Sequence, residues 1–201
     1  PNWLLTPSLT PNDKYYAHQW HYPKVNLPAA WDLTTGSPTV RLAILDTGRT
    51  PHGDLAGKWA PGVEYDASSE DGNATATTTW NHGVAVASIA GGTSNNSTHS
   101  TGACWNCQLL NVDVESGNYI NLAAVIRGTY WAIENGARVI NMSFETALPC
   151  SAPAQPDRDI PALRAALEFA ASKNVTVVAA AGNAGLDAKD TSPASCPASS
   201  P

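Results

Sequence analysis

Residues 40–48 read Val-Arg-Leu-Ala-Ile-Leu-Asp-Thr-Gly, and this stretch indicates the fold class. Its apolar run lacks the polar alternation of a half-exposed strand, so we expect a strand at 40–45 that is buried on both faces. Similar apolar runs occur further along the chain, at 109–114, 139–142 and 175–180. Segments with helical spacing lie at 82–90, 122–135 and 160–172, the last preceded by Asp159 as a candidate N-cap. This order of strands and helices predicts an α/β fold of three layers, a mostly parallel β-sheet with helices on both faces.

The chain divides into two parts by composition. Residues 1–38 are rich in Pro, Asn, Trp and Tyr and lack sustained periodicity, so we interpret them as an irregular arm with a short helix at 27–33. Trp20 and Trp31 are expected to hold this arm against a domain over residues 39–201. Segments rich in Ser, Thr, Asn and Gly predict surface loops at 66–80 and 91–102.

Composition excludes several classes of function. Only 14% of the 201 residues are charged and the net charge is −6, so no basic footprint favours nucleic acid or an anionic membrane. No apolar run approaches the ~20 residues that span a bilayer. The chain starts at Pro1 without an initiator Met or a signal sequence, so we interpret it as processed or excised.

Three polar residues adjoin the predicted strands and helices where chemistry is expected. In open parallel sheets, ligands bind outside the carboxyl ends of the strands. Asp46 ends the first apolar run, His82 opens a helical run of small residues, and Asn183 follows the run that ends in Ala-Ala-Gly. Taken singly, each residue type is common in turns and helix caps.

Taken together and in this order, these residues resemble the subtilisin family of serine peptidases, whose triad runs Asp, His, Ser along the chain. The resemblance covers most of the chain, including the arm, where Asn-Asp at 12–13 and Gln-Trp-His-Tyr at 19–22 resemble the mature amino terminus of secreted bacterial members. The matching motifs are Leu-Asp-Thr-Gly at 45–48, His-Gly-Asp-Leu at 52–55, Asn-His-Gly at 81–83, Val-Ile-Asn-Met-Ser at 139–143 and Ala-Ala-Ala-Gly-Asn at 179–183. Val84 and Ala85 depart from the family's usual Thr and His.

The resemblance implies a role for each of the three residues. A serine hydroxyl is a weak nucleophile until a base removes its proton, and His82 is expected to be that base. Asp46 is expected to fix the histidine tautomer and stabilise the imidazolium. Asn183 is expected to donate its side-chain amide to the oxyanion of the tetrahedral intermediate. This chemistry requires no cofactor.

The resemblance also implies an extended peptide or protein substrate that pairs with two stretches of the chain. The expected substrate-binding residues are Gly117, Asn118 and Tyr119 on one side, Ser143, Phe144 and Glu145 on the other, with Ala181 and Gly182 before the oxyanion residue. Glu145 stands where the family usually has Gly. It either points to solvent or favours a basic or polar substrate residue beside the cut bond.

The family's nucleophile segment, Gly-Thr-Ser-Met-Ala-x-Pro, is missing beyond Asn183. The Gly-Thr-Ser at 92–94 ends a helical run instead of opening one, so Ser94 is not the expected nucleophile. We therefore expect a fold that is incomplete at its carboxyl end and a chain that is inactive alone. Three explanations stay open: a truncated enzyme, half of a two-chain enzyme whose partner supplies the Ser, or a non-catalytic peptide-binding module. A nucleotide-binding domain built on 182–185 lacks the three-glycine fingerprint.

The four cysteines and one acidic loop are further candidates for disulfides and metal binding. A Cys-x-x-Cys at 104–107 alone can be redox-active or half a zinc site. The resemblance to secreted relatives instead implies disulfides between Cys104 and Cys107 and between Cys150 and Cys196, and hence an extracellular location. The oxygen-rich segment at Asp66 and 71–73 either binds a structural calcium ion or is a solvated acidic loop.

Overall fold

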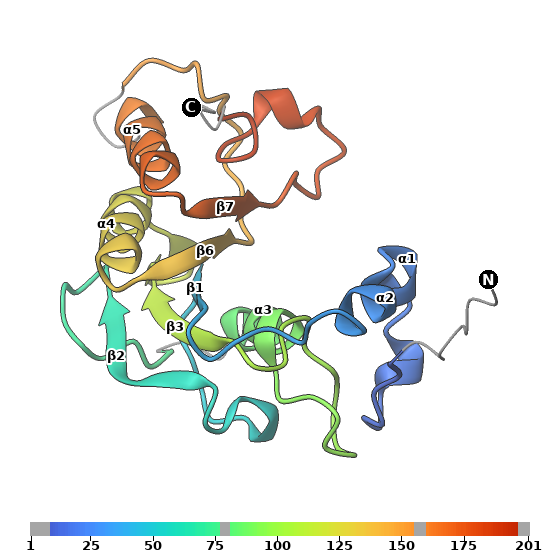
Figure 1. Ribbon diagram of the computed structural model, residues 1–201. Coiled ribbons are helices and arrows are strands. Elements are labelled where there is room, and N and C mark those ends of the chain that lie inside the picture. The colour runs from blue at the N-terminus through green and yellow to red at the C-terminus, as the bar shows by residue number, and fades with distance from the viewer. Residues whose placement is uncertain (1–8, 77–80, 155–159, 197–201) are drawn as a thin grey trace.

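The computed structural model describes residues 9–76, 81–154 and 160–196. Its centre is a five-stranded sheet in the order β2-β3-β1-β6-β7, and every neighbouring pair is parallel (Figure 1). The strands are β1 (Arg41–Asp46), β2 (Trp59–Asp66), β3 (Gln108–Asp113), β6 (Ala137–Met142) and β7 (Thr176–Ala179). The predicted parallel sheet is therefore confirmed, and its four predicted strands lie within one or two residues of the expected bounds.

Helices cover both faces of this sheet. The three long helices are α3 (His82–Gly91), α4 (Leu122–Glu134) and α5 (Ile160–Ser172). Successive residues of β1 point to opposite faces: Ile44 packs in a cluster with Val84 of α3, whereas Ala43 and Leu45 pack in the larger cluster with α4 and α5. The three-layer prediction is thus confirmed. Asp159, the candidate N-cap of α5, lies outside the described residues.

Some strands were missed and two loop predictions were too broad. β2 contains Pro61 and Gly62, which are typical of turns, and its pairing with β3 shifts register between Trp59 and Glu64. A short antiparallel hairpin of β4 (Glu115–Ser116) and β5 (Tyr119–Ile120) was also missed. The predicted surface loop at 66–80 begins with Asp66, which is buried at the end of β2, and its residues 77–80 lie outside the described residues. The loop at 91–102 has buried ends around a more exposed middle.

The amino-terminal arm contains η1 (Tyr16–His18), α1 (His21–Lys24) and α2 (Leu27–Trp31). Trp31 is buried and donates from Nε1 to the carbonyl of Ala103 at 2.9 Å. The hydroxyl of Tyr22 bonds the carbonyl of Ile89 in α3 at 2.9 Å. Trp20, by contrast, is 73% exposed, so the prediction that it anchors the arm was wrong. Trp20 is the N-cap residue of α1, and this helix packs through Tyr22 instead.

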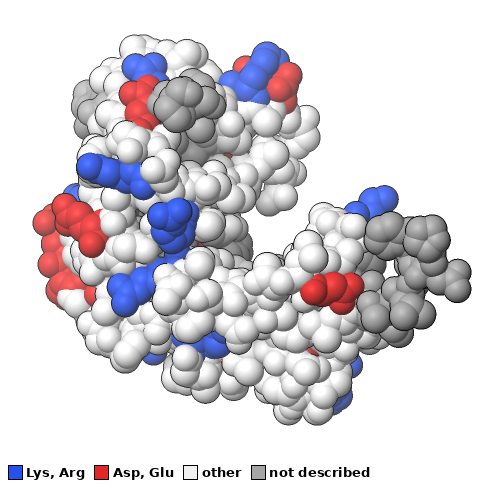
Figure 2. All heavy atoms as spheres, viewed as in Figure 1, with Lys and Arg blue, Asp and Glu red and all other residues white. Residues whose placement is uncertain are grey.

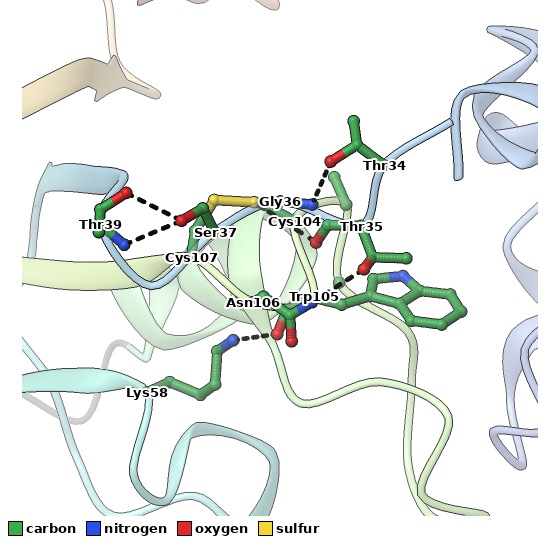
Figure 3. Close-up of a disulfide and its surroundings, with 12 residues drawn as sticks. Thr34, Thr35, Gly36, Ser37, Thr39, Lys58, Cys104, Trp105, Asn106 and Cys107 are labelled. Atoms are coloured by element: carbon green, nitrogen blue, oxygen red, sulfur yellow. Dashed lines mark hydrogen bonds between the residues drawn. A yellow bond between two sulfur atoms is a disulfide. The ribbon is translucent and has the colours of Figure 1, made fainter. Parts of the chain in front are cut away.

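Two disulfides join the expected cysteines, Cys104 with Cys107 and Cys150 with Cys196. Figure 3 shows the first of them beside the segment that leads from the arm into β1. There the backbone N–H of Asn106 donates to the carbonyl of Thr35 at 3.0 Å. This disulfide therefore lies where the arm joins the sheet. Neither free thiols nor a membrane-crossing helix occurs among the described residues.

Candidate functional site

The site is built where the end of β1 meets the start of α3. Asp46 is the last residue of the strand and His82 the first of the helix. His82 Nδ1 lies 2.7 Å from Asp46 Oδ1. Gly83 allows this close approach, because a Cβ there would lie 2.6 Å from the carbonyl oxygen of Gly48. The N–H of Gly83 also donates to Thr47 Oγ1 at 3.0 Å, which fixes the helix start on the strand end.

Asp46 and His82 differ in their exposure to solvent. Asp46 is 1% exposed, whereas the His82 side chain is 36% exposed. Burial raises the pKa of Asp46, and the hydrogen bond and charge interaction with His82 act in the opposite direction. The backbone N–H of Thr47 gives Oδ1 a second hydrogen bond at 2.8 Å. A carboxylate held in this way favours the tautomer with a proton on Nδ1, which leaves Nε2 able to accept a proton.

A cavity of about 1050 Å³ connects these residues with the other predicted site residues. Asp46, His82 and Asn183 all line it, although they come from distant parts of the chain. Its lining also includes five of the eight predicted substrate-binding residues: Asn118, Tyr119, Ser143, Phe144 and Glu145. The other three, Gly117, Ala181 and Gly182, are not among the described residues that line it.

The loop after β7 carries Asn183 and is held by Glu145. The backbone N–H of Asn183 donates to Glu145 Oε1 at 3.0 Å. Gly182 has φ 103°, and a Cβ there would collide with Oε2 of Glu145. The Glu145 side chain therefore lies over this loop. Sequence reasoning considered solvent and substrate as its surroundings but missed the contact with Asn183, because nothing in the sequence signals that pairing.

Three serines could be considered as nucleophiles within the described residues. Ser94 follows the far end of α3, and ten residues of helix put that end roughly 15 Å from His82. Its hydroxyl bonds the carbonyls of Gly92 and Gly102. Ser143 and Ser192 do line the cavity, but Ser143 Oγ accepts from Asn141 and Ser192 Oγ donates to the carbonyl of Leu148. All three hydroxyls thus have structural partners.

A row of three aspartates crosses the ends of the strands. Asp113 of β3 lies in register with Asp46 on one side and Asp66 of β2 on the other. Burial is the main cause that raises the pKa of Asp113 to about 7, and the charges of Asp66, Glu115 and Asp46 raise it further. The hydrogen bond from the backbone N–H of Glu115 acts in the opposite direction. Sequence reasoning missed Asp113, although it ends a buried apolar run just as Asp46 does.

The segment considered for calcium is folded on itself. Asp66 Oδ1 accepts the backbone N–H groups of Ser68 and Ser69, and its Oδ2 accepts the Ser69 hydroxyl. Asp71 Oδ1 accepts the N–H of Asn73 at 2.8 Å. Within the described residues no group of three or more His, Cys, Asp or Glu has an arrangement that could hold a metal ion. Calcium binding by this loop therefore stays a prediction.

Comparison with known proteins gives sequence relatives that include proteins named as proteases. Over 182 residues the chain is 36% identical to "Thermitase" of Thermoactinomyces vulgaris, covering 88% of this chain and 59% of thermitase. Over 191 residues it is 35% identical to "Thermophilic serine proteinase" of Bacillus sp. (strain AK1), covering 92% of this chain and 43% of that relative. The chain thus spans about half the length of these curated relatives.

Solved structures agree with the sequence relatives. A structure titled "Proteases from Pseudoalteromonas arctica PAMC 21717" superposes with a TM-score of 0.81 at 29% identity, covering 94% of this chain and 63% of that one. A cold-adapted subtilisin-like serine proteinase superposes with a TM-score of 0.61 at 28% identity, covering 80% and 54%. The family model described as "Subtilase family" matches residues 37–201. With this match over most of its length, the chain belongs to the subtilase family of serine peptidases.

Proposed function

We propose that this chain is the part of a secreted serine endopeptidase that supplies the base, its orienting acid and the oxyanion donor. The observation that carries the proposal is the 2.7 Å contact between His82 Nδ1 and Asp46 Oδ1 on the wall of the cavity that Asn183 also lines. An acid, a base and a side-chain amide that line one cavity are the groups that acyl transfer by a serine requires, once a hydroxyl is placed among them.

In the proposed mechanism, His82 takes the proton of the attacking hydroxyl through Nε2 and then gives it to the leaving amine. Asp46 keeps the ring in the required tautomer and stabilises its positive charge. The side-chain amide of Asn183 donates to the oxyanion that forms on the scissile carbonyl. The peptide substrate lies extended between residues 117–119 and 143–145, with its main chain paired to both.

The nucleophile comes from a segment outside this sequence or from a second chain. The outer face of α3 supports this part of the proposal, because Ala85 is exposed and Ile89 is 49% exposed. A helix that is apolar all round is normally buried, so a further segment is expected to pack on α3. Figure 2 shows the hollow between the β7 side of the molecule and the arm, and the surfaces that face it are mostly uncharged in this view.

Secretion is supported by two independent features. Relatives named as extracellular proteases, such as that of Xanthomonas campestris, match the chain. The two disulfides are stable in an oxidising compartment. Calcium binding at 66–73 stays a prediction, and no step of the mechanism depends on it.

The first experiment tests the Asp46–His82 pair in the chain itself. Proton NMR should show a far-downfield resonance from the His82 Nδ1 proton, which disappears in His82→Ala and shifts upfield in Asp46→Asn. His52→Ala, which removes an exposed histidine outside the cavity, should leave the resonance in place. Absence of the signal from a folded parent chain would contradict the pairing on which the proposal rests.

The second experiment tests catalysis. The 201-residue chain alone should not cleave a fluorogenic peptide, and turnover that His82→Ala abolishes would overturn this expectation. Extending the chain with the unmatched carboxyl-terminal part of thermitase should create hydrolysis. That activity should be lost in His82→Ala and Asp46→Asn but kept in Ser94→Ala, since Ser94 lies beyond the far end of α3.

A non-catalytic peptide-binding module is the alternative. The specific observation in its favour is that Ser143 and Ser192, the serines among the described cavity residues, both have other hydrogen-bond partners. Peptide binding without cleavage by the extended chain would favour the module over the enzyme.

A further inference from the structure

The cavity has an unbalanced negative charge. Its described lining contains two carboxylates, Asp46 and Glu145, and neither a lysine nor an arginine. Asp46 is buried and its charge faces the imidazole of His82. Glu145 is exposed, and no lysine or arginine within the described residues forms an ion pair with it. Glu145 is therefore the charged side chain of this cavity that a bound ligand can contact.

The structure places the Glu145 carboxylate over the loop after β7. One oxygen accepts the backbone N–H of Asn183 at 3.0 Å, and the other lies against Gly182, where any larger residue would collide with it. The bond to Asn183 already restricts this side chain, so binding a partner costs less further conformational entropy than it would for an unbonded glutamate. A carboxylate has about four lone-pair sites, so the bond to Asn183 leaves it able to accept from a cation.

The walls near Glu145 suit the stem of a long basic side chain. Phe144 and Ala147, which neighbour Glu145 in the chain, line the same cavity and supply apolar surface. Lysine and arginine side chains pack their methylene groups on such surface while the charged end reaches a polar partner. A neutral or acidic side chain would leave Glu145 without that partner or would repel it.

We propose that Glu145 is a specificity-determining residue that selects peptides with a lysine or arginine side chain in this cavity. The inference rests on the proposed function, because it assumes that a peptide occupies the cleft. It also has a catalytic consequence. Glu145 bonds the same residue whose side chain is proposed to hold the oxyanion, so its negative charge opposes that of the oxyanion, and a basic substrate side chain offsets the repulsion.

The test is binding, which does not need the missing serine. Two short fluorescent peptides, identical except for lysine or norleucine at one central position, are titrated into the 201-residue chain and followed by fluorescence anisotropy. We expect the lysine peptide to bind roughly tenfold more tightly, a difference of about 1.4 kcal/mol, and the preference to shrink as salt is added.

Two variants assign the preference to Glu145. Glu145→Gln keeps an oxygen that can accept from Asn183 but removes the charge, and it should bring the two affinities within about twofold of each other. Glu134→Gln removes the same charge from an exposed position at the end of α4, outside the cavity, and should keep the full preference. Circular dichroism should show that both variants are folded like the parent.

The outcomes separate this inference from the function that underlies it. Binding of both peptides without a lysine preference, or a preference that persists in Glu145→Gln, overturns the role of Glu145 alone. Failure of both peptides to bind the folded parent chain overturns the peptide cleft, and the inference with it. Loss of the lysine preference in Glu145→Gln and its survival in Glu134→Gln supports the proposal.

Discussion

Replacing Asp113 with asparagine should stabilise the protein, and the gain should appear only as the pH rises. Asp113 is 3% exposed and lies in register between Asp46 and Asp66. Burial and the neighbouring carboxylates raise its pKa from 3.8 to about 7. Asparagine has nearly the same shape and an oxygen that can still accept the N–H of Glu115, but it carries no charge.

The direction follows from proton binding in the two states. Below pH 3.8, Asp113 holds its proton in both the native and the unfolded chain, so the substitution removes no charge. Between 3.8 and about 7 the unfolded chain gives up that proton while the native chain keeps it, so the parent loses stability as the pH rises. Above pH 7 the native state carries the full cost of the buried charge.

The size of the effect follows from the same pKa. The pKa of Asp113 rises from 3.8 in the unfolded chain to about 7 in the native state. At about 1.36 kcal/mol for each pKa unit, this shift sets an upper limit of about 4 kcal/mol on the stability lost to the buried charge. Relaxation and hydration of the charged group lower this value in real proteins, so we expect Asp113→Asn to gain about 2 kcal/mol at pH 8 relative to pH 4.

Urea unfolding followed by tryptophan fluorescence at pH 4, 6 and 8 measures this gain, since the chain has 7 tryptophans. The difference between variant and parent at each pH cancels the titration of the other groups. The control is Asp187→Asn: the hydrogen bond from Lys189 lowers the pKa of that exposed carboxyl below 3.8, so its effect on stability should be nearly constant from pH 4 to 8. A stability difference for Asp113→Asn that is the same at all three pH values would refute the reasoning.

Two further predictions concern the stability of the fold. The Cys150–Cys196 disulfide closes a loop of sequence separation 46 and the Cys104–Cys107 disulfide one of 3, so replacing the first pair with serine should cost about 2 kcal/mol more unfolding free energy than replacing the second. Equal costs in urea titrations of the two double variants would contradict this chain-entropy argument. Gly128→Ala should destabilise the protein by about 1 to 3 kcal/mol, because the new Cβ would lie 2.8 Å from a methyl carbon of β3. An unchanged thermal midpoint would show that α4 can move away from the sheet at little cost.

The sequence predicted those strands and helices whose apolar residues follow a clear local pattern. The apolar runs of β1, β3, β6 and β7 are continuous because both of their faces are covered, and such runs are visible in the sequence. β2 was missed because Pro61 and Gly62, which are typical of turns, interrupt its sequence. The burial of Trp20 was predicted wrongly because the sequence shows that a side chain is apolar, but not whether it points toward the core or toward solvent.

The sequence by itself determined the α/β class, the parallel sheet, the family and three polar residues at element ends, because all of these rest on short-range patterns and motifs. Only the tertiary structure decided which side chains meet. The 2.7 Å contact of His82 with Asp46, the bond from Asn183 to Glu145 and the row that includes Asp113 join residues far apart in the chain. Their distances depend on how strands pair and how closely a helix approaches the sheet. No local pattern encodes that geometry, because it arises from packing over the whole domain.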